Sequence, residues 1–524
     1  MLSTNDLLQS AIAYQQRGQI AEAESLYRQI ISAEPGNVAA WRWLGVLAWQ
    51  TNNQEAAIRC LHQAMEIKPD DAEHHHDLGQ MLAAEGRPEE AEAHFRRAIA
   101  LKPQYALGHY NLGTLLYERK QLDEAIHCLR RAIKADPQLV IAHHNLGLAL
   151  FDQGKLEEAT VCYRRALKLE PKLAPAHHNL GNTLAAMGEY EEALASEYKA
   201  LELEPSYAQA HAGVAVLLLL TGEFKRGWPE YEWRWKTDKL VPRDFPQPRW
   251  EGQPLNGRTI LLHAEQGLGD TFQFIRFAPL LKAHGATVIV ECAKPEFKLL
   301  NNCQGIDQLI PAGNALPSFD YHIPLLSIPG VLGISLATIP ANVPYLFANP
   351  DLIEAWRSKL DSPDKFRIGI NWRGREGTGE FRKRDIPLDF FSGLAATPGI
   401  QLISLQKGGE QELRAAGDRL PIIELEGLDT ANGAFMDTAA VMTNLDLVIT
   451  SDTSIAHLAG GLGVPVWVAL PFVPDWRWLL NRSDSPWYPT MRLFRQKKPG
   501  GWTDVFIEIE EAARKQLVHK QRRS

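Results

Sequence analysis

Residues 106–137, ALGHYNLGTLLYERKQLDEAIHCLRRAIKADP, are one copy of a pattern that recurs through the first half of this 524-residue chain. Proline, alanine and a Leu-Gly pair each return at intervals of 34 residues. The prolines are Pro35, Pro69, Pro103, Pro137, Pro171 and Pro205; the alanines are Ala23, Ala57, Ala91, Ala125, Ala159 and Ala193; the pairs begin at Leu44, Leu78, Leu112, Leu146 and Leu180. Chance does not produce this agreement at three positions, so the chain contains repeats.

Each repeat predicts a pair of helices. In residues 106–137 the first helix passes through Leu112 and Leu116, and the second begins near Leu122 with Ala125 and Leu129 on one face. Glycine and alanine let the two helices approach closely, and proline ends the second helix. This is the signature of tetratricopeptide repeats, whose units stack because none buries its apolar face alone. We therefore expect an all-α superhelix over residues 1–238, with the first helices along its concave side.

The last repeat departs from the pattern. Ala215 stands where the other units have glycine, and residues 222–235 read GEFKRGWPEYEWRW, which is rich in aromatic side chains. This composition predicts that the terminal repeat packs onto another part of the chain.

Two rows of side chains follow the first helices at the repeat spacing. One row is Asp77, Asn111, Asn145 and Asn179. An asparagine amide offers a donor and an acceptor, the complement of a peptide unit, so this row predicts tolerant binding of an acceptor polypeptide at ~1 kcal/mol per bond. The alternative is that these are solvated helix residues. The other row is Trp41, His75, His109, His143, His177 and His211. Its members are on the order of 10 Å apart, too far to share a metal, and the tryptophan indicates that the row is structural.

Composition excludes several classes of protein. With 45% hydrophobic and 23% charged residues the chain is typical of soluble globular proteins, and its net charge of -8 does not favour nucleic acid or acidic membranes. Five cysteines without a CxxC spacing argue against a disulfide framework or a zinc site. The amino terminus lacks a signal-peptide pattern, and the apolar run at 214–220 is too short to span a membrane. We expect a reduced, cytoplasmic protein.

The second half predicts an α/β fold. Strand-like runs alternate with helical patterns, such as those at 271–283 and 454–462. The expected strands are 259–263, 287–292, 367–372, 401–406, 445–450 and 464–470. Apolar strands that alternate with helices indicate parallel, doubly wound sheets. We divide this half into a linker at 239–258, a Rossmann-like lobe at 259–345 and a second such lobe at 346–524, which ends in a helix.

The turn at 264–270, AEQGLGD, follows the first strand and opens a helix. Gly267 and Gly269 would let the backbone approach a ligand, and the helix start favours negative charge. Phe272 stands where the dinucleotide fingerprint has its third glycine, and no P-loop sequence is present. Asp270 could equally be a simple helix cap.

The turn at 450–454, TSDTS, ends the strand LDLVIT and opens the helix that carries His457. We expect Ser451, Thr453 and Ser454 to present exposed hydroxyls and free amides at the helix start, which would suit a diphosphate, with His457, one turn in, facing the same end. Asp452 could instead be a cap and His457 a packing residue. Both turns follow carboxyl ends of strands, where open α/β sheets bind ligands.

Cations gather between these turns. Residues 373–384 contain Arg373, Arg375, Arg382, Lys383 and Arg384, and Lys407 ends the next strand. They form either a solvated loop or a site that neutralises a leaving diphosphate. No DxD motif occurs after residue 236, so we expect no metal-chelated diphosphate.

Three segments resemble the lipopolysaccharide heptosyltransferases, which are two-lobed B-type glycosyltransferases. They are GLGD at 267–270, the basic loop before Ile386, and SDTSIAHLAGGLGVPVWVAL at 451–470, within a resemblance that covers 258–500. Ser454 replaces the glycine of the family's DTGxxH loop. The repeats ahead of such a domain are similar in architecture to O-GlcNAc transferase and to bacterial repeat-bearing protein glycosyltransferases, including those that modify flagellin.

The resemblance implies that Asp270 is a catalytic base, that Arg384 lies near a phosphate, and that residues 452–457 bind the donor. Glu265 and His263 are alternative bases. We expect a metal-independent, inverting glycosyltransferase without a cofactor, which moves a sugar from a nucleotide sugar to a protein hydroxyl. The alternatives are a non-catalytic scaffold with a degenerate enzyme fold, and a heptosyltransferase-like enzyme that acts on a saccharide.

Overall fold

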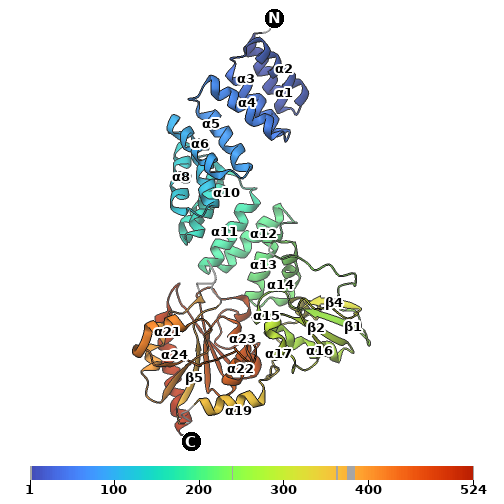
Figure 1. Cartoon of the computed structure of the whole chain (residues 1–524), viewed down its shortest axis with the longest axis vertical. Coiled ribbons are helices and arrows are strands. Elements are labelled where there is room, and N and C mark those ends of the chain that lie inside the picture. Colours follow the sequence, from blue (N-terminus) through green and yellow to red (C-terminus); the bar gives the residue numbers. More distant parts are fainter. Residues whose placement is uncertain (1–2, 239, 361–363, 375–383, 523–524) are drawn as a thin grey trace. The chain divides into compact units, whose positions relative to one another are not determined.

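The computed structural model describes residues 3–238, 240–360, 364–374 and 384–522. The chain forms two compact units, Met1–Pro205 and Ser206–Ser524. The first unit is built from helices, and the second contains two parallel sheets (Figure 1).

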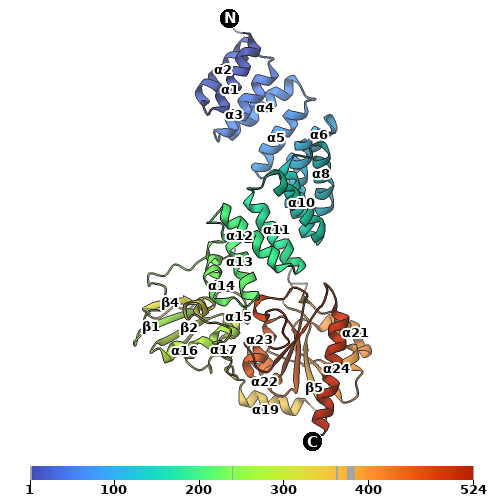
Figure 2. The ribbon, with the colours of Figure 1, turned by 180° about the vertical axis from the view of Figure 1, so that it is seen from behind.

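The first unit is a stack of helix pairs (Figures 1 and 2). Its helices are α1 (Thr4–Gln16), α2 (Ile20–Ala33), α3 (Val38–Gln50), α4 (Gln54–Ile67), α5 (Ala72–Ala84), α6 (Pro88–Leu101), α7 (Ala106–Glu118), α8 (Leu122–Ala135), α9 (Val140–Asp152), α10 (Leu156–Leu169), α11 (Ala174–Met187) and α12 (Tyr190–Leu203). Each repeat proline lies just beyond the second helix of its pair, from Pro35 after α2 to Pro205 after α12. The predicted repeat structure is confirmed.

Small residues allow the helices of a pair to touch. A side-chain carbon added at Gly113 would lie 2.7 Å from Cγ of Leu129, and one added at Gly147 would lie 2.6 Å from Cε1 of Tyr163. The repeat alanines, such as Ala125 and Ala159, are completely buried. These positions therefore need glycine and alanine for steric reasons.

The degenerate last repeat makes its contacts within the second unit. It comprises α13 (Ala208–Leu220), α14 (Phe224–Tyr231) and the 3-10 helix η1 (Glu232–Lys236). Nε1 of Trp228 donates to the carbonyl of Ile334 at 2.9 Å, and its ring lies 5.5 Å from the ring of Trp476. The expectation that this repeat packs onto another part of the chain is confirmed.

The first sheet is four-stranded and all parallel, in the order β3-β2-β1-β4. Its strands are β1 (Thr259–His263), β2 (Thr287–Cys292), β3 (Gln308–Pro311) and β4 (Tyr321–Pro324); its helical segments are α15 (Leu268–Phe274), η2 (Ile275–Phe277), α16 (Ala278–Ala283), η3 (Lys294–Glu296), α17 (Phe297–Leu300), η4 (Leu325–Ser327) and α18 (Ile328–Val331). The linker runs beside β4, where the amide of Trp250 donates to the carbonyl of His322 at 2.9 Å. The helical pattern expected at 271–283 is confirmed as the consecutive segments α15, η2 and α16, whose change to a 3-10 helix precedes Pro279, a residue without the amide that a continuous helix needs.

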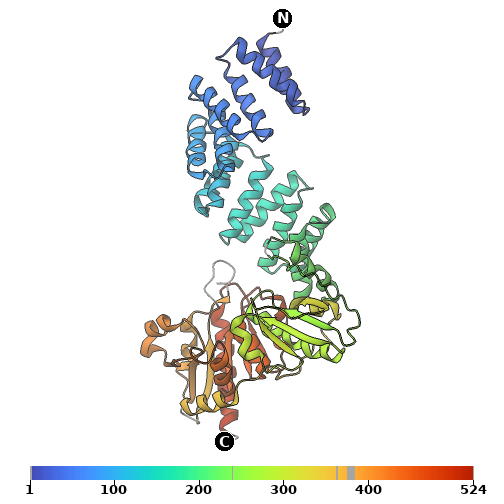
Figure 3. The ribbon, with the colours of Figure 1, turned by 45° about the vertical axis from the view of Figure 1, so that its right-hand side comes forward.

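The second sheet is six-stranded and all parallel, in the order β10-β9-β8-β5-β6-β7. It lies in the orange-to-red part of the ribbon in Figure 3. Its strands are β5 (Phe366–Asn371), β6 (Ile400–Ser404), β7 (Ile422–Ile423), β8 (Leu447–Ser451), β9 (Val466–Leu470) and β10 (Met491–Arg495). Its helical segments are α19 (Pro350–Lys359), η6 (Leu388–Phe391), α20 (Ser392–Ala395), α21 (Glu410–Ala416), η7 (Gly417–Arg419), α22 (Met436–Thr443), α23 (Ser454–Leu462), η8 (Trp476–Trp478) and α24 (Trp502–Gln521). The α/β class predicted for this half, with parallel sheets, is confirmed.

Candidate functional site

The two turns singled out by the sequence lie against each other. Residues 264–270 lead from β1 into α15, and residues 451–454 lead from β8 into α23. A side-chain carbon at Gly269 would lie 2.9 Å from Cδ2 of His457 and 3.3 Å from Cα of Ser454. The turns at the carboxyl ends of β1, in the first sheet, and β8, in the second sheet, therefore lie next to each other. Open α/β sheets bind ligands at such strand ends.

Asp270 is held from two sides. Its Oδ2 accepts a hydrogen bond from the amide of Gly267 at 2.8 Å, which caps α15. Its Oδ1 accepts one from Nη2 of Arg477 at 2.5 Å. The side chain remains 16% exposed. The capping role is thus present, and the role as catalytic base stays a prediction.

Arg477 is a site residue that the sequence reasoning missed. It is buried in η8, where Nε donates to Oε1 of Gln273 at 2.8 Å and Nη1 donates to Oδ1 of Asp475 at 2.9 Å. A buried arginine needs carboxylate partners because desolvation of an unpaired charge is costly. The signal in the sequence is an arginine between Trp476 and Trp478, shortly after a buried strand.

The hydroxyls of the second turn are tied to the neighbouring strand. Oγ1 of Thr453 caps α23 by accepting from the amide of Ile455 at 3.3 Å. The same hydroxyl donates to Oδ1 of Asn371 at 3.0 Å, as does that of Thr450 at 3.1 Å. Oγ of Ser451 is fully buried and has no hydrogen-bond partner among the described residues. Asn371, at the end of β5, therefore orients the turn. The exposed hydroxyls expected at Ser451 and Thr453 are not found, because both side chains are buried.

Asp452 and His457 are buried within the same turn and helix. Burial and the nearby Asp475 raise the pKa of Asp452 to about 6. Burial and neighbouring arginines lower the pKa of His457 well below its usual range. Its Nδ1 pairs with the hydroxyl of Tyr488 at 2.9 Å, and its ring stacks on Trp478. His457 is therefore neutral at pH 7 and cannot contribute positive charge to a phosphate.

The predicted cations differ in their surroundings. A side-chain carbon at Gly374 would lie 3.6 Å from Nη2 of Arg384 and 3.8 Å from Cγ2 of Thr453, and the charge of Arg384 acts on Asp452, so Arg384 lies near the second turn. Arg373 is engaged elsewhere: its Nε donates to Glu412 at 3.2 Å and its Nη2 donates to the carbonyl of Gly408 at 2.6 Å. Lys407 is exposed. Arg375, Arg382 and Lys383 lie outside the described residues.

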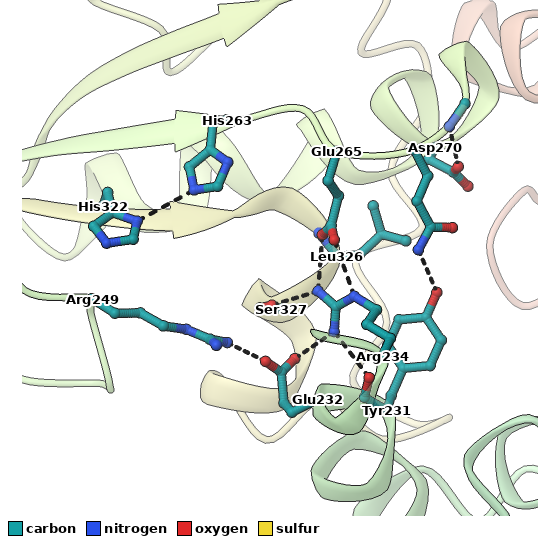
Figure 4. Close-up of polar contacts among 12 residues, drawn as sticks. Tyr231, Glu232, Arg234, Arg249, His263, Glu265, Asp270, His322, Leu326 and Ser327 are labelled. Carbon is teal, nitrogen blue, oxygen red and sulfur yellow. Dashed lines mark hydrogen bonds and ion pairs between the residues drawn. The ribbon is translucent and has the colours of Figure 1, made fainter. Parts of the chain in front are cut away.

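The two alternative bases are buried (Figure 4). Glu265 accepts two hydrogen bonds from Arg234, and its side chain is 3% exposed. His263 pairs with Nδ1 of His322 at 3.3 Å, and burial lowers the pKa of His263 to about 3. Neither side chain has the access to solvent that an acceptor hydroxyl would require. Asp270 is therefore the best candidate for the catalytic base among the three.

The asparagine row of the first unit links successive repeats. Each side chain bonds to a first helix of the preceding repeat. The contacts are Asn111 Nδ2 to His76 Nε2 (2.7 Å), Asn145 Nδ2 to Thr114 Oγ1 (3.0 Å), Asn179 Nδ2 to His144 Nε2 (2.9 Å), and Asp77 Oδ2 from Arg42 Nε (2.6 Å). At least one amide N–H of each asparagine is therefore engaged within the array, and binding of a polypeptide by this row stays a prediction.

The histidine row is structural, as predicted. A ring nitrogen of each of the first five members contacts the carbonyl of the proline six residues earlier, whereas His211 pairs through Nδ1 with Glu230. The pairs are Trp41–Pro35 (2.9 Å), His75–Pro69 (3.0 Å), His109–Pro103 (3.0 Å), His143–Pro137 (3.1 Å) and His177–Pro171 (3.0 Å). This contact satisfies a carbonyl beyond the end of each second helix.

Neither a metal cluster nor a membrane span emerges from the part of the chain that the structure describes. Within it, no three His, Cys, Asp or Glu side chains are grouped so that they could hold a metal ion. Likewise, none of the described helices is both long and apolar enough to cross a bilayer.

Comparisons with known protein families support the assignment of tetratricopeptide repeats. Models of tetratricopeptide repeats match residues 14–80, 79–118, 113–154, 147–188 and 174–207. Protein FlbA of Caulobacter vibrioides is 26% identical over 313 residues, which cover 55% of this chain and 52% of that protein. The chain thus spans about half the length of this curated relative.

Solved structures align with the repeats at low overall similarity. YrrB, described as a tetratricopeptide protein with an unusual peptide-binding site, is 24% identical over 35% of this chain and 95% of its own, with a TM-score of 0.32. PilF of Pseudomonas aeruginosa is 24% identical over 38% of this chain and 90% of its own, with a TM-score of 0.35. Together with the family models and the helix pairs, the 34-residue period identifies residues 14–207 as an array of tetratricopeptide repeats.

Proposed function

We propose that this chain is a glycosyltransferase that moves a sugar from a nucleotide sugar to a protein hydroxyl. The observation that carries the proposal is the contact of the 264–270 turn with the 451–454 turn at Gly269. Each turn follows a strand of a different parallel sheet, which is the arrangement expected of a two-lobed B-type enzyme. Ligands of open α/β sheets bind at such strand ends.

The second sheet would bind the donor. The start of α23, where the helix dipole favours negative charge, would receive the diphosphate, and Arg384 would add positive charge beside it. The hydroxyl of Thr453 holds the turn, through Ile455 and Asn371. As the bond between the anomeric carbon and the diphosphate breaks, negative charge grows on the leaving oxygen. Donors that are already oriented toward this charge stabilise the transition state without reorganising.

Asp270 would act as the base. The acceptor hydroxyl attacks the anomeric carbon with inversion, its proton passes to Asp270, and the nucleoside diphosphate leaves. A carboxylate is a weak base for an alcohol, so the proton moves late, in an oxocarbenium-like transition state. Arg477 and the amide of Gly267 fix the carboxylate in one orientation, and each of its oxygens retains a lone pair for the proton.

The repeats would hold the acceptor. Tetratricopeptide repeats provide an extended surface for another polypeptide, which matches a protein substrate better than a free saccharide. Transfer to a saccharide, as in a heptosyltransferase, is the alternative enzyme activity. Asn111 and Asn179 each use one N–H for the preceding repeat, so an acceptor could bind to the second N–H and to the amide oxygen of these two residues.

A non-catalytic scaffold is the second candidate. It is favoured by the engagement of both oxygens of Asp270, because a carboxylate that already accepts hydrogen bonds from Gly267 and Arg477 has fewer positions left for an acceptor hydroxyl. A scaffold with a degenerate enzyme fold would not respond to nucleotides.

A thermal-shift panel with UDP, GDP, ADP and CMP separates the two candidates. A ligand of the native state at ~100 times its Kd raises the free energy of unfolding by ~2.7 kcal/mol. We expect one nucleoside diphosphate to raise the Tm, and the matching nucleotide sugar to be consumed in the presence of an acceptor protein. Asp270→Asn should retain the Tm shift and lose turnover at least ~100-fold. No Tm shift with any of the four nucleotides would favour the scaffold.

A further inference from the structure

Arg234, in the last repeat, uses every hydrogen-bond donor that an arginine has. Its side chain is 7% exposed. Nε and Nη2 donate to the two oxygens of Glu265 at 3.0 and 2.9 Å, and Nη2 also donates to Oγ of Ser327 at 2.7 Å. Nη1 donates to the carbonyl of Tyr231 at 3.1 Å and to Glu232 at 2.8 Å. A guanidinium has five N–H groups, and all five are paired here (Figure 4).

These contacts join the repeat to two neighbouring strand ends of the first sheet. Glu265 belongs to the turn after β1, and Ser327 follows β4, which pairs with β1. Oε1 of Glu265 also accepts from the amide of Leu326 at 3.0 Å. Arg234 and Glu265 together therefore fix the start of the 264–270 turn relative to the adjacent strand.

Further contacts extend this arrangement in both directions. Glu232 also pairs with Arg249 of the linker. The hydroxyl of Tyr231 accepts from Nε2 of Gln266 at 3.4 Å, one residue further along the turn than Glu265. The far end of the turn is held by the pair of Asp270 and Arg477.

We propose that Arg234 is a positioning residue: through Glu265 the last repeat places the 264–270 turn, and with it Asp270, for sugar transfer. Its catalytic consequence rests on the function proposed above. The last repeat then contributes to the α/β domain, because the residues by which it departs from the repeat pattern position the 264–270 turn. Displacement of a reacting group by about 1 Å can slow a reaction ~100-fold, so the position of this turn matters.

The test compares Arg234→Lys in the full chain with wild type. Lysine keeps the charge but has three donors and no planar fork, so it cannot bind both oxygens of Glu265 in this geometry. We expect the amides of residues 264–270 to exchange with deuterium ~10-fold faster, while those of 451–457 are unchanged. If wild type transfers sugar, kcat should fall ~10-fold or more with KM for the nucleotide sugar within ~3-fold.

Arg258→Lys is the matched control. Arg258 lies at the other end of β1 and pairs with Asp320 at 3.0 Å, but its side chain is 63% exposed. A loss of general stability in Arg234→Lys would speed exchange at 451–457 as well, whereas a loss of positioning should speed it only at 264–270; neither effect is expected in Arg258→Lys.

The following results would overturn the positioning role of Arg234 or the proposed function. Unchanged exchange of 264–270 in folded Arg234→Lys, or an equal effect of Arg258→Lys, overturns the inference. Should Arg234→Lys not fold, Glu265→Gln takes its place with the same expectation; failure of both to fold makes Arg234 a folding residue and also overturns it. If wild type transfers sugar from no donor, the proposed function fails, while the exchange experiment still decides whether Arg234 positions the turn.

Discussion

Oδ1 of Asp270 accepts a hydrogen bond from Nη2 of Arg477 at 2.5 Å, across 207 residues of sequence. The two residues belong to segments of different sheets, α15 after β1 and η8 after β9. Both side chains are largely buried, at 16% and 8% exposed. This ion pair and the contact at Gly269 bring the candidate base and the candidate donor site together.

The Asp270–Arg477 pair should show a measurable coupling energy. In a double-mutant cycle with Asp270→Asn and Arg477→Gln, urea unfolding should give a coupling of ~1–3 kcal/mol, because the pair is shielded from solvent. The exposed pair of Arg482 and Asp484 is the control, for which ~0–1 kcal/mol is expected. A coupling no larger than that of the control would mean that the pair does not hold the two sheets together.

Arg384→Ala should weaken donor binding and slow transfer together. The guanidinium contributes to the ground state and to the charge that develops on the leaving diphosphate, so both Kd for the nucleotide and kcat should worsen by ~10-fold or more. Isothermal titration and initial rates measure the two effects. Arg414→Ala, an exposed change on α21, is the control. An effect on kcat alone would place Arg384 away from the bound nucleotide.

Replacement of Asn111, Asn145 and Asn179 by alanine should weaken binding of an acceptor polypeptide by ~1–4 kcal/mol and leave nucleotide binding unchanged. The matched control is the triple change of Arg96, Arg130 and Arg164 to glutamine. These arginines also join successive repeats, through Glu124, Glu158 and Glu192 at 2.6 Å each, but from the second helices. If both triple variants lose the same affinity, the asparagine row serves only to hold the repeats together.

The repeat array could be predicted almost completely from the sequence, because its signal is local and recurs. A single proline is weak evidence for the end of a helix, but six prolines at equal intervals show where the second helix of each repeat ends. The longer buried strands were also predictable, and β1 and β2 have the expected bounds. Strands β3, β4, β7 and β10 were missed. β3, β4 and β7 have two to four residues, too few to show alternation, whereas β10 is as long as β1.

The residues that hold the site together could not be found in this way. Arg477 and Asp270 are far apart in sequence, and Arg234 lies 31 residues from Glu265, so no periodic pattern relates either pair. Conversely, glycine at 269 was identified as a point of close approach, but the sequence could not say that the neighbour is α23. Motifs at strand ends indicate where a site lies, whereas the partners of its charges depend on how the sheets pack.

Glu296→Gln should raise the Tm at pH 8 and have little effect at pH 5. Burial raises the pKa of Glu296 to about 7, above its unfolded value. The folded state therefore binds a proton that the unfolded state releases between pH 4.5 and pH 7, and the stability linked to it is lost as the pH rises through the folded pKa. The neutral amide avoids this loss, which is worth ~1–3 kcal/mol at pH 8. Calorimetry at both pH values, with exposed Glu251→Gln as the control, measures the difference; equal Tm values at pH 8 would place Glu296 in contact with water.

Gly269→Ala should destabilise the second unit, whereas Gly267→Ala should be nearly neutral. The added methyl group at 269 would lie 2.9 Å from the ring of His457 and 3.3 Å from the backbone of Ser454. His457 cannot turn away easily, because it is stacked on Trp478 and bonded to Tyr488. Such overpacking costs ~1–3 kcal/mol.

At Gly267 the nearest atom to an added methyl group is Oδ2 of Asp270 at 3.4 Å, and φ is -82°, which any residue adopts. We therefore expect a change within ~0.5 kcal/mol for Gly267→Ala. Urea unfolding of the two variants measures the contrast directly, without a substrate. The same variants then test the site: if the turns form the nucleotide site, Gly269→Ala should also reduce the Tm shift given by the nucleoside diphosphate. Equal stability of the two variants would show that α15 and α23 are not in contact in solution, and the site built on that contact would have to be abandoned.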